Sequence, residues 1–223
     1  MKPWIFSALT VLGKDINLEV RSRYAINTVL VFVLTSTLVI IFAVGADELT
    51  DQAISGLVWI IVLFASLSTL ARSFVSEAER GTMDLLRLHT DGTEVFAGKL
   101  IFNFLLTLSI TIPAFIVYFF LLNIPIQNFY LLASSVLLGT IALAGVSTLL
   151  GALISQAARK GTAFSVISLP LLVPLVLMLV RVTQASITTD PVENIGEDIL
   201  AIIGFGGTTI TASFILFDYI WKD

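Results

Sequence analysis

Six apolar stretches, each near the roughly 20 residues that a helix needs to cross a bilayer, follow one another along this chain. A chain that is 57% hydrophobic and only 13% charged could not hide that much apolar surface in a water-soluble fold. We therefore expect one all-α integral membrane domain over residues 1–223, with about six membrane spans. Their expected positions are residues 25–45, 54–74, 100–122, 129–154, 163–182 and 199–221.

Residues 1–24 predict an amphipathic helix that lies along the membrane surface, with Trp4 as an interfacial anchor. The alternative is that this segment is the first part of a longer helix. The apolar residues recur at helical spacing and the polar residues line another face: Ile5, Leu9, Leu12, Ile16 and Val20 form the first set, and Lys14, Asn17 and Arg21 the second.

Basic residues are distributed unevenly between the two sides of the predicted spans. Eleven of the twelve Lys and Arg residues fall on one side, and only Arg181 lies at the edge of an opposite loop. Cytoplasmic loops of membrane proteins carry the excess of Lys and Arg. This pattern predicts that both termini are cytoplasmic.

The longest polar segment, residues 75–99, is expected to lie in the cytoplasm and to contain a short helix. Thr82 can cap that helix, and Asp84 falls in its first turn, where the helix dipole favours an anion. Asp91-Gly92 ends it, and Thr93-Glu94 can open the third span. The leucines of such a helix need a partner, either the membrane surface or a groove on a cytoplasmic protein.

The sequence contains no recognisable catalytic constellation. His89 has no companion, and the absence of cysteine removes disulfides, thiol nucleophiles and Cys-ligated metals. The segment Gly92–Leu100 departs from a phosphate-binding loop in its glycine spacing and in having Leu100 where Ser or Thr would hold Mg²⁺. Lys99 is instead expected to extend toward the membrane interface. We expect a chain with no enzymatic activity and no metal site.

The predicted spans hold no charge at mid-membrane, which argues against a proton- or ion-coupled carrier. They do hold small residues at packing spacing and prolines that permit kinks. These positions fit either ordinary helix packing or a moving interface, and the prolines and glycines alone do not decide between the two. The hinge and packing candidates are Pro113, Gly139, Gly145, Gly151, Pro170 and Pro174.

The stretch Ser76–Leu86, with Gly98-Lys99 at the next helix start, resembles the ABC-2 class of exporter permeases. The resemblance implies the ABC-2 transporter fold and a coupling helix that docks on a cytoplasmic ATPase. The alternative is that these charges form a solvated loop face. The docking residues that the resemblance implies are Glu77, Glu79, Arg80, Gly81, Thr82, Met83, Asp84, Leu85 and Leu86.

Three motifs in the second half, together with length and helix count, resemble the CcmB type of heme exporter subunit: Leu137-Leu138-Gly139-Thr140, Arg159-Lys160-Gly161 and Leu169–Leu175. The resemblance implies two copies of this chain with two copies of the ATPase, in a bacterial inner membrane. It also implies a heme-handling membrane protein, a small single-span subunit and a periplasmic heme chaperone as partners. Membrane lipid surrounds the complex, and no nucleic-acid partner is expected. The basic residues expected at the interface are Lys99, Arg159 and Lys160.

Heme iron takes His, Met, Cys or Tyr as an axial ligand. This chain has no Cys, its only His is His89 in the cytoplasmic segment, and Met178 is the only methionine in a predicted span. We therefore expect ATP to be bound by the partner and heme to be handled by the complex, with no cofactor held by this chain. An ABC-2 exporter for another cargo (a drug, lipid or glycan), a non-transporting membrane scaffold and an intramembrane enzyme remain alternatives.

Overall fold

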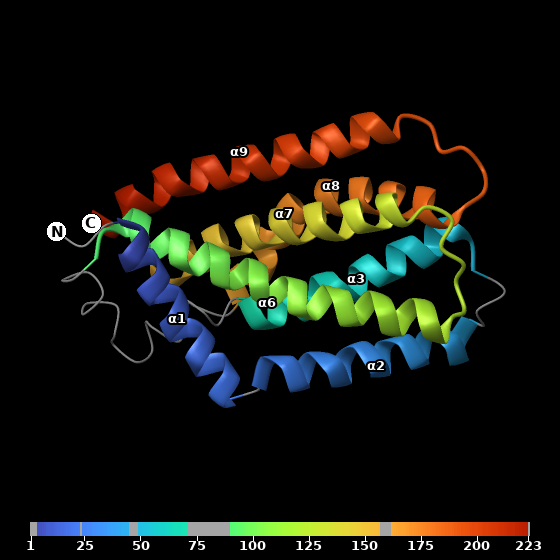
Figure 1. Ribbon diagram of the computed structural model, residues 1–223, viewed down its shortest axis with the longest axis horizontal. Helices are drawn as coiled ribbons and strands as arrows, with labels where there is room; N and C mark the ends of the chain where they lie inside the picture. Colours follow the sequence, from blue (N-terminus) through green and yellow to red (C-terminus); the bar gives the residue numbers. More distant parts are fainter. Residues whose placement is uncertain (1–3, 23, 45–48, 71–89, 157–161, 223) are drawn as a thin grey trace.

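The computed structural model describes residues 4–22, 24–44, 49–70, 90–156 and 162–222, and within these ranges all regular structure is helical. The helices form an elongated bundle, with the first residues of α1 and the last of α9 at one end (Figure 1). We call this the terminal end, and the opposite end, which includes residues 188–194, the loop end. The helices are α1 (Trp4–Ser22), α2 (Tyr24–Val44), α3 (Asp51–Leu70), α6 (Gly92–Leu121), α7 (Phe129–Gln156), α8 (Thr162–Ile187) and α9 (Ile195–Lys222).

Two long helices, α6 and α7, occupy the centre of the bundle. α7 lies against α6, α8 and α9, whereas α6 also contacts α1, α2 and α3. α1 runs obliquely across the start of α6 (Figure 1). α6 therefore connects most of the bundle to the terminal end.

Local polar contacts explain where several helices begin. The Asn128 side-chain oxygen accepts the backbone N–H groups of Tyr130 and Leu131 at 3.1 and 3.2 Å, which caps α7. At the start of α6, the backbone N–H of Asp91 donates to a Glu94 carboxylate oxygen at 3.4 Å. These contacts satisfy backbone groups that the first turn of a helix leaves without partners.

The core packs tightly around Trp59 of α3. Its indole N–H donates to the Thr183 hydroxyl at 2.8 Å, and its ring meets Phe115 edge-on at 5.4 Å. A Cβ atom at Gly139 of α7 would clash with this ring, and one at Gly145 would lie 2.7 Å from an Ile210 side-chain atom. These two glycines therefore allow α7 to approach its neighbours closely.

The expected N-terminal helix and the six expected apolar segments each overlap an observed helix, although several bounds differ. α6 begins at Gly92 and not near residue 100, so residues 92–99 of the expected cytoplasmic segment are helical. The cause is the Asp91–Glu94 cap followed by the buried residues Val95 and Phe96. The expected short helix over residues 81–88 lies outside the described residues.

Within the described residues, four helices contain segments long and apolar enough to cross a membrane: Asn27–Val44, Gly92–Leu121, Phe129–Gly151 and Ile195–Asp218. Shorter apolar segments, Asp51–Leu67 and Leu172–Ile187, lie in α3 and α8. Large apolar side chains such as Phe42 and Phe120 are not covered by the chain. Length, composition and this exposed apolar surface fit a multi-pass membrane protein.

Candidate functional site

At the terminal end, the start of α6 is held by the last turns of α9. The Trp221 indole N–H donates to the backbone carbonyl of Thr90 at 3.2 Å. A Cβ atom at Gly92 would lie 2.7 Å from the Trp221 Cβ, so only glycine lets α9 approach this closely. Phe96 of α6 meets Phe214 and Phe217 of α9 with ring centroids 4.7 and 5.3 Å apart. These contacts fix where the chain enters α6.

From its other side, the start of α6 is held by α1. The Trp4 indole N–H donates to the Thr93 hydroxyl at 3.2 Å. A Cβ atom at Gly98 would lie 2.7 Å from the backbone oxygen of Ala8 and 2.8 Å from the Val11 Cβ. The two backbones therefore approach closely at Gly98, as small residues allow in membrane helices.

A buried ion pair completes this contact. The Lys99 ammonium lies 3.0 Å from a carboxylate oxygen of Asp15 on α1, and the two side chains are 0% and 7% exposed. Lys14, which is partly exposed, lies 3.4 Å from the other oxygen of the same carboxylate. The expectation that Lys99 extends toward the membrane interface is therefore wrong, because its charge is paired inside the chain.

Buried polar side chains also join α6 to α7. The Asn103 side-chain amide donates to the Thr148 hydroxyl at 2.8 Å, and that hydroxyl donates to the backbone oxygen of Ala144. The Asn103 carbonyl oxygen is buried with no hydrogen-bond partner. Thr107 and Thr111, also buried, donate to backbone oxygens of their own helix. Polar contacts of this kind hold membrane helices together.

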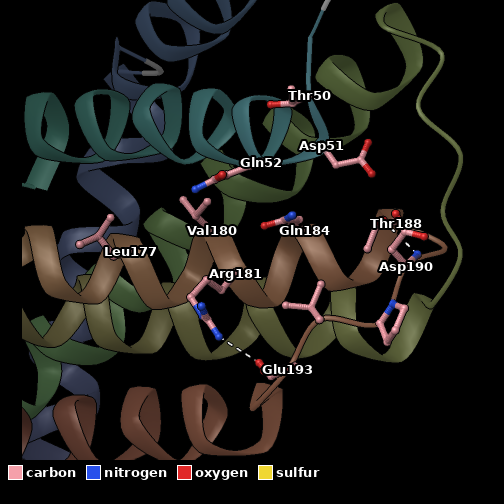
Figure 2. A pocket seen from close by; sticks show the side chains of 12 residues that line it. Thr50, Asp51, Gln52, Leu177, Val180, Arg181, Gln184, Thr188, Asp190 and Glu193 are labelled. Atoms are coloured by element: carbon pink, nitrogen blue, oxygen red, sulfur yellow. Dashed lines mark hydrogen bonds between the residues drawn. The ribbon is translucent and has the colours of Figure 1, made fainter.

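At the loop end, a cavity of about 770 Å³ opens between α3, α8 and the chain that leads to α9 (Figure 2). Gln52 of α3 and Gln184 of α8 lie between these two helices (Figure 2). Three carboxylate residues, Asp51, Asp190 and Glu193, also line the cavity. Polar and apolar side chains share the lining, and three of its four charged residues are acidic.

Among the residues that the structure describes, Arg181 is the only basic one that lines this cavity, and it has partners within the chain. Its Nε–H donates to Asp198 at 2.7 Å. A second guanidinium N–H donates to the backbone oxygen of Glu193 at 2.9 Å (Figure 2). These bonds tie the end of α8 to the start of α9. The Arg181 side chain is 47% exposed and that of Asp198 is 16% exposed.

The structure does not describe most residues that the sequence singled out for docking and for the interface. The proposed docking residues 77–86 and the basic pair Arg159-Lys160 lie outside the described residues. Pro113 lies within α6, Pro170 and Pro174 lie within α8, and Gly151 is buried in α7. Their role as hinges stays a prediction.

Sequence reasoning missed Asp15 and Trp221 at the terminal end and named Gly98 only as part of a helix start. Asp15 lies on the same face of α1 as Ala8 and Val11, and all three are buried. A buried carboxylate takes a cationic partner. This face is not the apolar stripe expected from the sequence, however, and its burial depends on how α1 crosses α6.

Residues 6–216 match the model of the family described as CcmB protein. Three relatives named "Heme exporter protein B" are similar to this chain. The protein of Rhodobacter capsulatus is 32% identical over 74% of this chain and 76% of its own length, and that of Bradyrhizobium diazoefficiens is 30% identical over 79% and 81%. The Paracoccus denitrificans protein is 31% identical over 74% of this chain and 76% of its own length.

Proposed function

This chain belongs to the CcmB family, and we propose that it is the membrane subunit of an ABC-type heme export complex that serves cytochrome c maturation. The family match over residues 6–216 is the observation that carries the proposal. Three relatives bear the name heme exporter protein B, and the four long apolar helices suit a membrane subunit. The ABC-2 fold with six spans and cytoplasmic termini in a bacterial inner membrane is part of the same proposal.

In this proposal, energy enters from an ATPase on a separate chain and reaches the bundle through residues 75–91. Foremost among the residues proposed to dock are those that precede the start of α6 in the sequence: Glu79, Arg80, Gly81, Thr82 and Asp84. α6 starts directly after this segment and is held on both sides, by α1 and by α9. Displacement of the segment would therefore be passed to α6, which contacts α1, α2, α3, α7 and α9.

The chain is proposed to act without binding ATP or ligating heme iron. Heme iron takes His, Met, Cys or Tyr as an axial ligand, and this chain has no Cys and a single His. Heme would be cargo handled by a partner, and this chain would transmit the ATPase cycle to it, promoting release of a loaded chaperone. An axial-ligand spectrum from the purified chain mixed with hemin would contradict this part of the proposal.

The test is purification of the chain from its native membrane, with an ATPase assay and mass spectrometry of what accompanies it. We expect an ABC ATPase and heme-handling proteins. If an ATPase accompanies the chain without the heme-handling proteins, the chain belongs to an exporter of another cargo. If no ATPase accompanies the chain, the proposal of an ABC permease is wrong.

A variant with Arg80→Glu and Asp84→Arg tests the docking residues. We expect it to enter the membrane at normal levels and to lose cytochrome c assembly, because both charges at the proposed contact are reversed. Glu48→Gln, distant in sequence from that contact, is the control. Normal cytochrome c assembly in the double variant would contradict the docking role.

A further inference from the structure

Close packing of α1 against α6 does not by itself require the buried ion pair between Asp15 and Lys99. Removing two charges from water is unfavourable, and their attraction offsets that cost only when the geometry is good. Apolar residues of similar volume often stabilise such a contact as well or better. Stability alone therefore does not account for a fully buried Lys99. In some proteins a buried polar or ionic pair also specifies a single alignment of the two elements that carry it.

Two further contacts define that alignment. Trp4 bonds to Thr93, and Gly98 admits the backbone of α1 near Ala8. Together with Asp15–Lys99, these contacts follow the same order along both helices. A slide of α1 along α6 would break the hydrogen bond and separate the charges. Gly98 lets the two backbones approach closely. The ion pair determines the register, that is, which residues of α1 lie beside which residues of α6.

We propose that Asp15 and Lys99 are positioning residues that hold α1 in one register on α6, so that the two helices move as one body. In the proposed function α1 is a helix on the membrane surface, and this pair makes it part of the path by which motion enters the bundle. That consequence rests on the proposed function. The rigid connection between α1 and α6 does not rest on it.

The register can be measured directly. The double variant Asp15→Asn with Lys99→Met removes both charges and leaves neither ion buried alone, so we expect it to fold. Spin labels at Thr10→Cys on α1 and Leu105→Cys on α6 occupy exposed positions. The chain has no native cysteine to compete for label. The sample is the complex purified from membranes into nanodiscs, and singly labelled protein identifies distances between copies.

We expect a narrow distance distribution with the native pair and a broad or shifted one in the neutral double variant. The exchanged variant Asp15→Lys with Lys99→Asp restores opposite charges and should restore the narrow distribution. The matched control is Arg181→Gln with Asp198→Asn at the loop end, which should leave the distance unchanged. A narrow, unshifted distribution in the neutral variant would overturn the proposal, because packing at Gly98 would then fix the register alone.

A second readout separates positioning from the proposed function. Cytochrome c assembly per ATP hydrolysed should fall on the order of tenfold in the neutral variant, the scale of a coupling of about 1.4 kcal/mol. It should recover in the exchanged variant. Unchanged assembly despite a broadened distance would overturn the role in transmission. If no ATPase accompanies the chain, the proposed function fails, and the distance measurement still decides whether the pair sets the register.

Discussion

Each end of the bundle carries an ion pair between two helices, and the two pairs differ in how much of the chain covers them. Asp15–Lys99 at the terminal end is buried, with a fully covered lysine. Arg181–Asp198 at the loop end is shorter, 2.7 against 3.0 Å, yet its arginine is 47% exposed. Water and salt weaken an exposed pair, whereas a buried pair keeps its strength and leaves an isolated charge when broken. Burial, more than distance, therefore decides what each pair does.

The surroundings of the two ion pairs also differ in how tightly the chain is packed. Next to Lys99, Gly98 brings two backbones together and leaves no room for a side chain. Next to Arg181, a cavity lined by both polar and apolar side chains opens between α3 and α8. The terminal end thus holds α1 and α6 in close contact, whereas at the loop end hydrogen bonds from the Arg181 side chain join α8 to the start of α9.

Asp15→Asn is expected to lower the thermal midpoint most, because it removes the carboxylate that pairs with the buried Lys99. Breaking a buried pair from one side costs about 3–5 kcal/mol. We expect the thermal midpoint in nanodiscs to fall by roughly 10 °C, since about 1 kcal/mol corresponds to 2–4 °C in a chain of this size. Differential scanning fluorimetry of the purified protein measures it.

Asp15→Glu is the matched control because it keeps the charge and lengthens the side chain by one methylene. It should lose much less stability than Asp15→Asn. Equal midpoints for Asp15→Asn and the unsubstituted protein would show that Lys99 does not depend on this carboxylate, and the contrast between the two ends would disappear.

An intermediate effect is expected from Gly98→Ala. The added methyl would meet the backbone oxygen of Ala8 at 2.7 Å, so α1 must move away from α6. Overpacking of this kind costs about 1–3 kcal/mol. Gly13→Ala on α1 is the control, because a Cβ there meets nothing within 4 Å. It should be neutral or stabilising, since alanine favours the helix. Equal midpoints for the two variants would mean that α1 does not approach α6 closely.

The sequence predicted the helices because its apolar stretches have the length and composition of membrane spans. Gly139 and Gly145 were singled out by spacing, and the structure shows which side chains pack against them. Lys99 was misjudged for a physical reason. A lysine beside an apolar stretch fits a side chain that reaches the interface, and its partner Asp15 lies 84 residues away in the sequence. Local patterns identify a helix face, whereas a pair between helices depends on how the helices cross.

Arg181→Gln is expected to lower the thermal midpoint least. The salt dependence of this change is the most direct test of the difference between the two ion pairs. Exposed ion pairs contribute little to stability, and added salt weakens them further. The variant should melt slightly below the unsubstituted protein at low salt, and the difference should vanish as salt is raised. The deficit of Asp15→Asn should persist over the same range, because salt screens buried charges much less.

Thermal midpoints at low and high NaCl, measured side by side for Arg181→Gln and Asp15→Asn, test this contrast. Arg181 also donates to the backbone of Glu193, and glutamine can keep part of that bond. A deficit in Arg181→Gln that persists at high salt would therefore identify this hydrogen bond, and not the charge of Asp198, as the contact that fastens the loop end. The two ends would then differ in the kind of bond that holds them as well as in its burial.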